Sequence, residues 1–459
     1  MKKQLIYIST ALLVGLSACT DKLDLQPRQS IDAALALSTE QDLQSAIVGA
    51  YGQIGSGSGY GTNFNLLAEL QAAESYITWR GTFAGYREVA NKTMTNTNTE
   101  ASRTWLNSYQ AINTVNSVLA NLDKAKDANV KKTLEGEARF IRGILFFELV
   151  RYYALPWGTA TGNSQPGLPL VLTPSATLEQ ATAQTPRSTV AQTYAQIIDD
   201  LTKASTLLGN DNTTRADRFS ALAFLARVYL QQGDYTRALA AANQVITMGN
   251  YRLNPSVLAA FRNRNTGESI FEIQQNDQNN AGASNDGLTT FYASLPVNGV
   301  SVGRGDIQIN NATVNSYAAT DARRTELFYL GVKGGGARFY TAKWADFGAN
   351  IPIIRLAEML LIRAEANLRI GSTTGATPAA DLNAVRQRAS LAPVVAPVLN
   401  DVLQERRFEL AFEGLRIHDI KRLRQTTGTL AWNAPKLIFP IPKREVDANP
   451  ALAQNEGYN

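Results

Sequence analysis

The side chains with the clearest chemical potential are the aromatic and polar groups of two long, irregular segments, residues 55–98 and 254–350. The faces of Trp, Tyr and Phe rings can stack on the apolar faces of sugar rings, while neighbouring Asn, Asp and Arg side chains hydrogen-bond to hydroxyl groups. Loops this long inside a compact protein are usually functional. The candidate ligand-binding residues are Trp79, Arg80, Tyr76, Tyr86, Phe291, Tyr292 and Trp344.

Trp79 is the strongest single candidate among these residues. Arg80, Gly81 and Gly85 follow it closely, and this composition is typical of an exposed turn rather than of a core. For every ring in the two segments, packing beneath a loop is the alternative to ligand contact, and the sequence leaves both open.

Catalytic and metal-binding chemistry has few residues available in this chain. It has 459 residues but only one His, His418, and one Cys, Cys19, so an internal disulfide, a Cys-cluster metal site and a His-rich zinc site are excluded. We expect His418 to be a packed or hydrogen-bonded helix residue rather than a base. The residues give no reason to expect a metal or a cofactor.

Loop carboxylates are the remaining catalytic option. Asp277, Asp306 and Asp346 lie near aromatic residues, and a glycoside hydrolase would need two such groups at a defined separation. Asn276, Asp277 and Asn279 also offer oxygen ligands for calcium, but such clusters are more typical of turns, which is the interpretation we prefer.

The charge balance argues against a polyanionic partner. Lys and Arg number 44 and Asp and Glu number 39, which gives a formal net charge of +5. Removal of residues 1–18 would take Lys2 and Lys3 away and leave 42 basic against 39 acidic residues, or +3. The chain has no long run of like charges, so we expect no binding to nucleic acid.

The N-terminus predicts export and lipidation. Lys2 and Lys3 precede an apolar stretch at residues 5–16, which is too short to span a bilayer stably. Leu16-Ser17-Ala18-Cys19 resembles a bacterial lipobox, in which the Cys is acylated and becomes the new N-terminus. We therefore expect a signal peptide at 1–18, lipid on Cys19 and a polar tether at 19–30, so that the protein is anchored to a membrane without crossing it.

The pattern beyond the tether is mainly helical. Apolar residues recur at steps of three and four over 135–152, and residues 215–249 predict two helices joined at Gly233. This pair resembles a tetratricopeptide repeat, which buries its apolar face only by stacking on neighbouring helices. Further helices are expected at 39–51, 104–122, 189–208, 355–369 and 381–388.

The segment 405–416 is expected to continue as one helix. Phe408, Phe412 and Leu415 fall on one stripe, which would face inward. At three-residue spacing Glu409 could pair with Arg406, and Glu413 could pair with Arg416 in the same way.

Several blocks together resemble one known family. They occur in a fixed order behind the lipobox, and the likeness extends over essentially all of the chain after Cys19. The blocks are residues 105–113 (WLNSYQAIN), 137–143 (EARFIRG), 146–153 (FFELVRYY), 363–366 (RAEA), 405–416 (ERRFELAFEGLR) and 441–450 (IPKREVDANP), with Gln454-Asn455 and Gly457-Tyr458. In this order they resemble the SusD/RagB outer-membrane nutrient-binding lipoproteins of the Bacteroidetes.

The resemblance implies a mainly α fold with tetratricopeptide-like helix pairs and a loop-rich C-terminal half. It implies one SusD-like domain over 31–459, with an N-terminal half at 31–253 and a C-terminal half at 254–459. It further implies a non-catalytic lipoprotein on the outside of the outer membrane, which captures an oligosaccharide or a peptide for a SusC-like TonB-dependent transporter. Ligand residues vary within the family and cannot be transferred by motif.

Two other functions remain open at this point. A lipid-anchored scaffold could use the helical repeats to hold other envelope proteins, and it would not depend on Trp79 or Trp344. A surface glycoside hydrolase would depend on the loop carboxylates.

Overall fold

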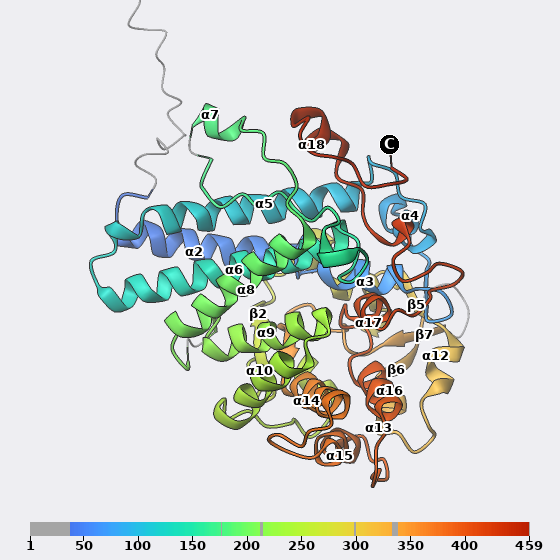
Figure 1. The fold of residues 1–459 in the computed structure, drawn as a ribbon. Helices are drawn as coiled ribbons and strands as arrows, with labels where there is room; N and C mark the ends of the chain where they lie inside the picture. Colours follow the sequence, from blue (N-terminus) through green and yellow to red (C-terminus); the bar gives the residue numbers. More distant parts are fainter. Residues whose placement is uncertain (1–36, 176, 212–213, 298–299, 333–337, 459) are drawn as a thin grey trace, which may run out of the picture.

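The computed structural model describes residues 37–175, 177–211, 214–297, 300–332 and 338–458 (Figure 1). The predicted signal peptide, the tether and Cys19 lie outside these residues, as does the start of the predicted 31–459 domain. Among the described residues, no helix combines the length and the apolar character needed to cross a membrane.

Helices α2, α5, α6 and α8 belong to the N-terminal half, and α2, α5 and α6 run side by side in Figure 1. Each begins at a side chain that accepts hydrogen bonds from free backbone N–H groups: Thr39 caps α2, Asn98 caps α5 and Asp127 caps α6. The helix predicted from periodicity at 135–152 is the buried part of α6. The four helices are α2 (Glu40–Ile54), α5 (Thr99–Ala120), α6 (Ala128–Tyr153) and α8 (Val190–Leu207).

The predicted tetratricopeptide-like pair is confirmed as α9 (Arg218–Gln232) and α10 (Tyr235–Met248). Gly233 ends α9 with φ +74°, a left-handed conformation that suits a residue without Cβ, and Asp234 caps α10. Ala226 and Ala238 are fully buried, so the two helices approach closely.

The helical array continues into the C-terminal half. Helix α14 (Leu356–Ile370) packs against α10, α15 (Pro378–Arg388) and α16 (Leu399–Glu409). The mainly α fold class is therefore confirmed. Shorter helices are α3 (Asn63–Gln71), α4 (Ala84–Asn91), α7 (Leu178–Ala181), α11 (Leu288–Tyr292), α12 (Asn311–Ser316), α13 (Ala322–Glu326), α17 (Arg416–Arg422) and α18 (Lys443–Ala448). Single 3₁₀ turns are Leu122–Lys124, Thr161–Asn163, Leu258–Phe261, Ala281–Ser284 and Pro435–Leu437.

Short antiparallel strands join the two halves. The largest sheet has the order β1-β5-β7-β6, and β1 pairs with β5 so that Ile77 lies opposite Ile309 and Trp79 opposite Ile307. This pairing brings the N-terminal loop segment onto the C-terminal half. The strands are β1 (Ile77–Trp79), β2 (Ser269–Ile273), β3 (Leu295–Val297), β4 (Val300–Val302), β5 (Ile307–Ile309), β6 (Phe328–Gly331), β7 (Arg338–Thr341) and β8 (Ile351–Arg355), with β2 paired to β8 and β3 to β4.

The prediction of one helix through 405–416 is wrong. Helix α16 ends at Glu409, and the chain turns through Phe412 and Gly414, which have φ +66° and +75°, before α17 begins. A positive φ is unfavourable for a bulky side chain, so the turn needs outside support. The Phe412 N–H donates to Tyr76 Oη at 2.9 Å, and Trp344 Nε1 donates to the Phe412 carbonyl at 2.8 Å.

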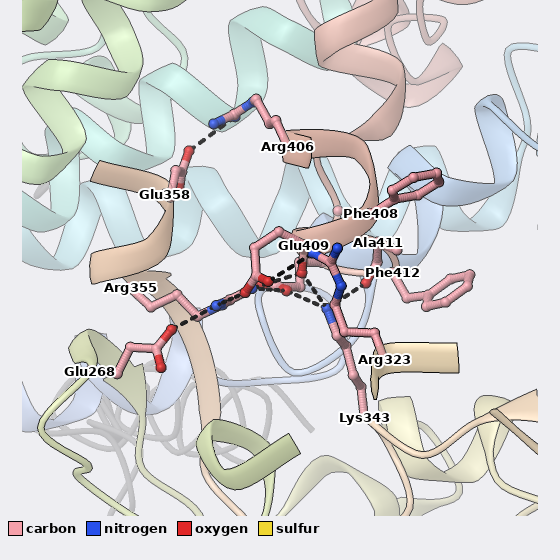
Figure 2. Close-up of polar contacts among 12 residues, drawn as sticks. Glu268, Arg323, Lys343, Arg355, Glu358, Arg406, Phe408, Glu409, Ala411 and Phe412 are labelled. Atoms are coloured by element: carbon pink, nitrogen blue, oxygen red, sulfur yellow. Dashed lines mark hydrogen bonds and ion pairs between the residues drawn. The ribbon is translucent and has the colours of Figure 1, made fainter. Parts of the chain in front are cut away.

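Charge pairing across the core accounts for the break in the helix. Glu409, fully buried, accepts hydrogen bonds from Arg355 at 2.6 Å and Arg323 at 3.2 Å, and also from Arg388 (Figure 2). The predicted pair between Glu409 and the neighbouring Arg406 does not form. We call this group the Glu409 cluster: Glu268, Arg323, Lys343, Arg355, Arg388, Glu409 and Glu413.

The other members of the cluster are also paired with opposite charges. Arg355 pairs with Glu268 and with Glu413, each at 2.7 Å, instead of the predicted pairing of Glu413 with Arg416. Lys343 Nζ donates to the backbone carbonyls of Glu409 and Ala411 at 2.9 Å, which ties the turn to the cluster. Although burial opposes it, the positive charges around Glu409 hold its pKa well below the usual value.

Substituting Glu409→Ala should destabilise the protein severely, because three arginines would remain buried without their shared acid. Loss of one partner from a buried ionic group costs about 3–5 kcal/mol. Denaturant unfolding of the soluble domain measures the difference. Asp447→Ala is the control, since the Asp447 side chain is 58% exposed and pairs with Lys443 at the surface, where about 1 kcal/mol or less is expected. Equal losses for both variants would contradict the assigned role of the cluster.

Candidate aromatic binding site

The structure divides the seven predicted ligand-binding residues into a buried set and an exposed set. Trp79 is half-buried and Arg80 is exposed. The five residues in the buried set are Tyr76, Tyr86, Phe291, Tyr292 and Trp344.

Three of the buried rings surround Phe412 in the core. Tyr76 stacks on Phe412 with the ring centres 5.1 Å apart, and Tyr292 meets it edge-on at 6.4 Å. Trp344 packs edge-on against Phe261 and gives its indole N–H to the Phe412 carbonyl. Tyr76 and Trp344 hydrogen-bond to the backbone of Phe412, and all three rings are buried away from the exposed surface of Phe83, so packing beneath a loop describes their surroundings.

The other two buried rings lie beneath an exposed aromatic surface. Trp79 tilts against Tyr86 at 5.1 Å and against Phe291 at 5.9 Å. Phe83 meets the edges of the same two rings at 6.2 and 5.9 Å. We call Trp79, Phe83, Tyr86 and Phe291 the aromatic patch, of which Tyr86 and Phe291 form the floor.

Three elements bring the patch together. Pairing of β1 with β5 fixes the backbone of Trp79, and Phe83 precedes the first turn of α4. Phe291 comes from α11 in the other half of the chain. Both α4 and β5 lie at the right-hand side of the molecule in Figure 1.

Trp79 is partly exposed, and its Nε1 atom lies on the buried side of the residue. Gly81 leaves the room that the indole needs, since a Cβ there would approach the ring to 2.4 Å. Phe83 is 39% exposed and adds a second ring surface. Apolar ring surface open to solvent suits stacking on the flat face of a sugar ring.

A polar rim surrounds the exposed rings. Arg304 lies over the Phe83 ring at 4.9 Å and is paired with buried Asp306 at 2.7 Å. Arg80 Nε donates to the Gln308 side chain at 3.1 Å. The guanidinium groups and the Gln308 amide therefore lie where they could hydrogen-bond to hydroxyl groups of a stacked ligand.

The floor of the patch is held rigidly. Tyr86 Oη donates to Asn63 Oδ1 at 2.8 Å and accepts from Arg103 Nη2 at 2.7 Å. Burial, reinforced by the negative charge of Glu100, raises the pKa of Tyr86 well above its usual value, so the phenol stays neutral. A fixed floor reduces the ordering cost of binding.

The loop carboxylates named from the sequence lie in different surroundings. Asp306 is buried and paired with Arg304, while Asp277 and Asp346 are exposed. Asn276 Oδ1 accepts from the N–H groups of Gln278 and Asn279, which makes that cluster a turn, as expected. Within the described ranges, no group of three or more His, Cys, Asp or Glu side chains is placed to hold a metal ion. His418 is buried against Tyr152, which confirms it as a packed residue.

Sequence reasoning missed Phe83, Arg304 and Gln308 as site residues. Phe83 and Arg304 lie in the two irregular segments that the sequence singled out. Their meeting depends on the register of β1 against β5, however, and no local pattern reveals that register.

Comparison with known proteins identifies the family. Residues 21–230 match a family model described as "Starch-binding associating with outer membrane", and residues 331–458 match the model of the "SusD family". SusD-like protein P2 of Formosa agariphila is 28% identical, and the alignment covers both chains completely. Starch-binding protein SusD of Bacteroides thetaiotaomicron is 30% identical over 31% of this chain and 32% of its own.

Solved structures agree with this match. A SusD superfamily protein from Bacteroides thetaiotaomicron superimposes with a TM-score of 0.80 at 25% identity, and the superposition covers 91% of this chain and 99% of that one. The helix pairs with inserted loops are therefore a SusD-like fold. The chain belongs to the SusD/RagB family.

Phe291→Ala and Phe83→Ala should separate the floor of the patch from its exposed surface. Phe291 is 1% exposed, so its removal leaves a cavity that costs about 3–5 kcal/mol and loosens Trp79 above it. Phe83→Ala should cost about 1 kcal/mol. Unfolding midpoints and the fluorescence of Trp79, in a background with the other tryptophans replaced, measure both effects. A larger loss for Phe83→Ala would contradict the assignment of floor and surface.

Proposed function

We propose that this protein is a non-catalytic binding protein of the cell surface that takes up an oligosaccharide on the aromatic patch. The observation that carries the proposal is an exposed Trp79 and Phe83 surface on a rigid floor, with Arg80 and Arg304 at its rim. Ring stacking gives affinity for sugar faces, and the rim gives orientation.

Family membership supports the sugar ligand. The family model for residues 21–230 is described as starch-binding, and so is the SusD relative from Bacteroides thetaiotaomicron. Asp306, the acid beside the rim, is buried and paired with Arg304, which fits capture better than hydrolysis.

Surface attachment and delivery complete the proposal. The same family description includes association with the outer membrane. Lipid on Cys19 and the tether at 19–30 would hold the domain at that membrane, and we propose that it passes its ligand to a SusC-like TonB-dependent transporter.

Trp79→Ala and Phe83→Ala should each weaken binding of an oligosaccharide at least tenfold, because each removes a stacking surface without removing the rim; tenfold corresponds to about 1.4 kcal/mol. Isothermal titration calorimetry with the best ligand from a neutral glycan panel, including maltoheptaose, measures the change. Tyr235→Ala, a half-buried ring on α10, is the matched control and should bind normally. Wild-type affinity in both patch variants would refute the aromatic patch as the site.

Cys19→Ala should abolish lipid attachment and release the protein from the membrane, because the chain has no other Cys to acylate. Metabolic labelling with an alkyne fatty acid, followed by membrane fractionation, measures both effects. Thr20→Ala is the neighbouring control and should remain labelled. If the wild-type protein is solubilised from native membranes without a TonB-dependent transporter, the delivery step is refuted while glycan binding still stands.

A further inference from the structure

A second hollow lies between α12, α16 and α17, and its chemistry differs from that of the aromatic patch. It has a volume of about 340 Å³, which is within the range of small-ligand sites. Phe408, Leu410 and Leu415 give it apolar walls, and Gln404 and Gln425 are exposed at its margin. We call it the arginine pocket because four arginines line it: Arg406, Arg407, Arg416 and Arg422.

Two of the four arginines are paired with acids. Arg422 binds Glu365 through two hydrogen bonds of 2.7 and 2.9 Å and contacts Asp419 at 2.6 Å. Arg406 shares Asp419 at 3.0 Å and reaches Glu358 at 3.1 Å (Figure 2). Asp419 is the only acid among the residues that line the pocket.

The other two arginines have no direct acidic partner among the described residues. Within the described chain, no carboxylate forms an ion pair with Arg407 or Arg416. Arg407 is exposed and Arg416 is half-buried. Burial lowers the pKa of Arg416, and the charge of nearby Arg407 lowers it further, while the charges of Asp419 and Glu69 oppose this shift without pairing directly with Arg416.

Arg406 adds a buried donor without an acceptor. Its side chain is 3% exposed, and its Nη1 atom is buried with no hydrogen-bond partner. A buried donor that stays unpaired is unfavourable, and more so when it is charged. An anion in the pocket would compensate the charges of Arg407 and Arg416 together.

We propose that the arginine pocket binds an oxyanion, a carboxylate or sulfate group carried by a sugar-sized ligand. Guanidinium groups present planar pairs of N–H donors that match the oxygens of such groups. The apolar walls suit the body of a sugar ring. The sugar-sized part rests on the proposed glycan-binding function, whereas the oxyanion part rests on the arginines alone.

The test compares four probes by isothermal titration calorimetry: galacturonate, glucose 6-sulfate, sodium sulfate and neutral galactose. The wild-type protein should bind at least one acidic sugar about tenfold or more tightly than galactose, and added NaCl should weaken this binding. Arg416→Gln and Arg407→Gln should each lower the affinity at least tenfold. Arg444→Gln is the matched control, since the Arg444 side chain is 69% exposed on α18.

The outcomes separate this proposal from the proposed function. Arg407 is exposed, so Arg407→Gln keeps the test valid if Arg416→Gln fails to fold. Retained oligosaccharide binding in Arg407→Gln, with acidic-sugar binding retained in Trp79→Ala, would support two separate sites. Sulfate binding as tight as that of the acidic sugars would support the oxyanion site and refute its sugar-sized part. The proposal is overturned if no oxyanion binds, or if both arginine variants bind like wild type.

Discussion

Buried charge is the constraint on which the arrangement of this protein depends. Burying a charge is costly unless it faces an opposite charge and its donors and acceptors are paired. Glu409 meets this condition through arginines from distant parts of the chain, Arg323, Arg355 and Arg388. It must therefore sit at the end of α16, and the chain must turn immediately after it.

That turn positions both candidate binding surfaces. Phe412 adopts its left-handed conformation against Tyr76, whose hydroxyl accepts from the Phe412 N–H. Tyr76 immediately precedes β1, which carries Trp79 into the aromatic patch, and Tyr76 also lines the arginine pocket. On the other side of the turn, α17 begins with Arg416. A few residues therefore link the Glu409 cluster and the turn after it to both candidate binding surfaces.

The local sequence predicts those helices and turns that are determined by neighbouring residues. Contacts between distant parts of the chain determine the remaining structure. Gly233 and Asp234 predict the turn of the α9–α10 pair from residue type alone. Gly favours the left-handed backbone conformation that ends a helix, and Asp can cap the next one. The break after Glu409 was not readable, since Arg406 offers a partner at helical spacing. Three other arginines contact Glu409 in the core. Their interactions with it outweigh a pair at helical spacing, which contributes only about a few tenths of a kcal/mol. The arginine pocket was not predicted for the same reason, because the helical spacing predicts an ion pair between Arg416 and Glu413.

The site was predictable as a region but not as a set of residues. Trp79 was identified by the turn-like residues around it, whereas Trp344 sits in equally polar sequence but donates its N–H to a core carbonyl. The cost in stability of a substitution therefore depends on how deeply the residue is buried. Phe83, Arg80 and Arg407 are exposed and make few packing contacts, so replacing them changes ligand chemistry at small cost in stability. Phe291 and Glu409 are buried, and replacing them disturbs the scaffold. Substitutions at the rim could therefore change the surface chemistry of this fold without disturbing the Glu409 cluster.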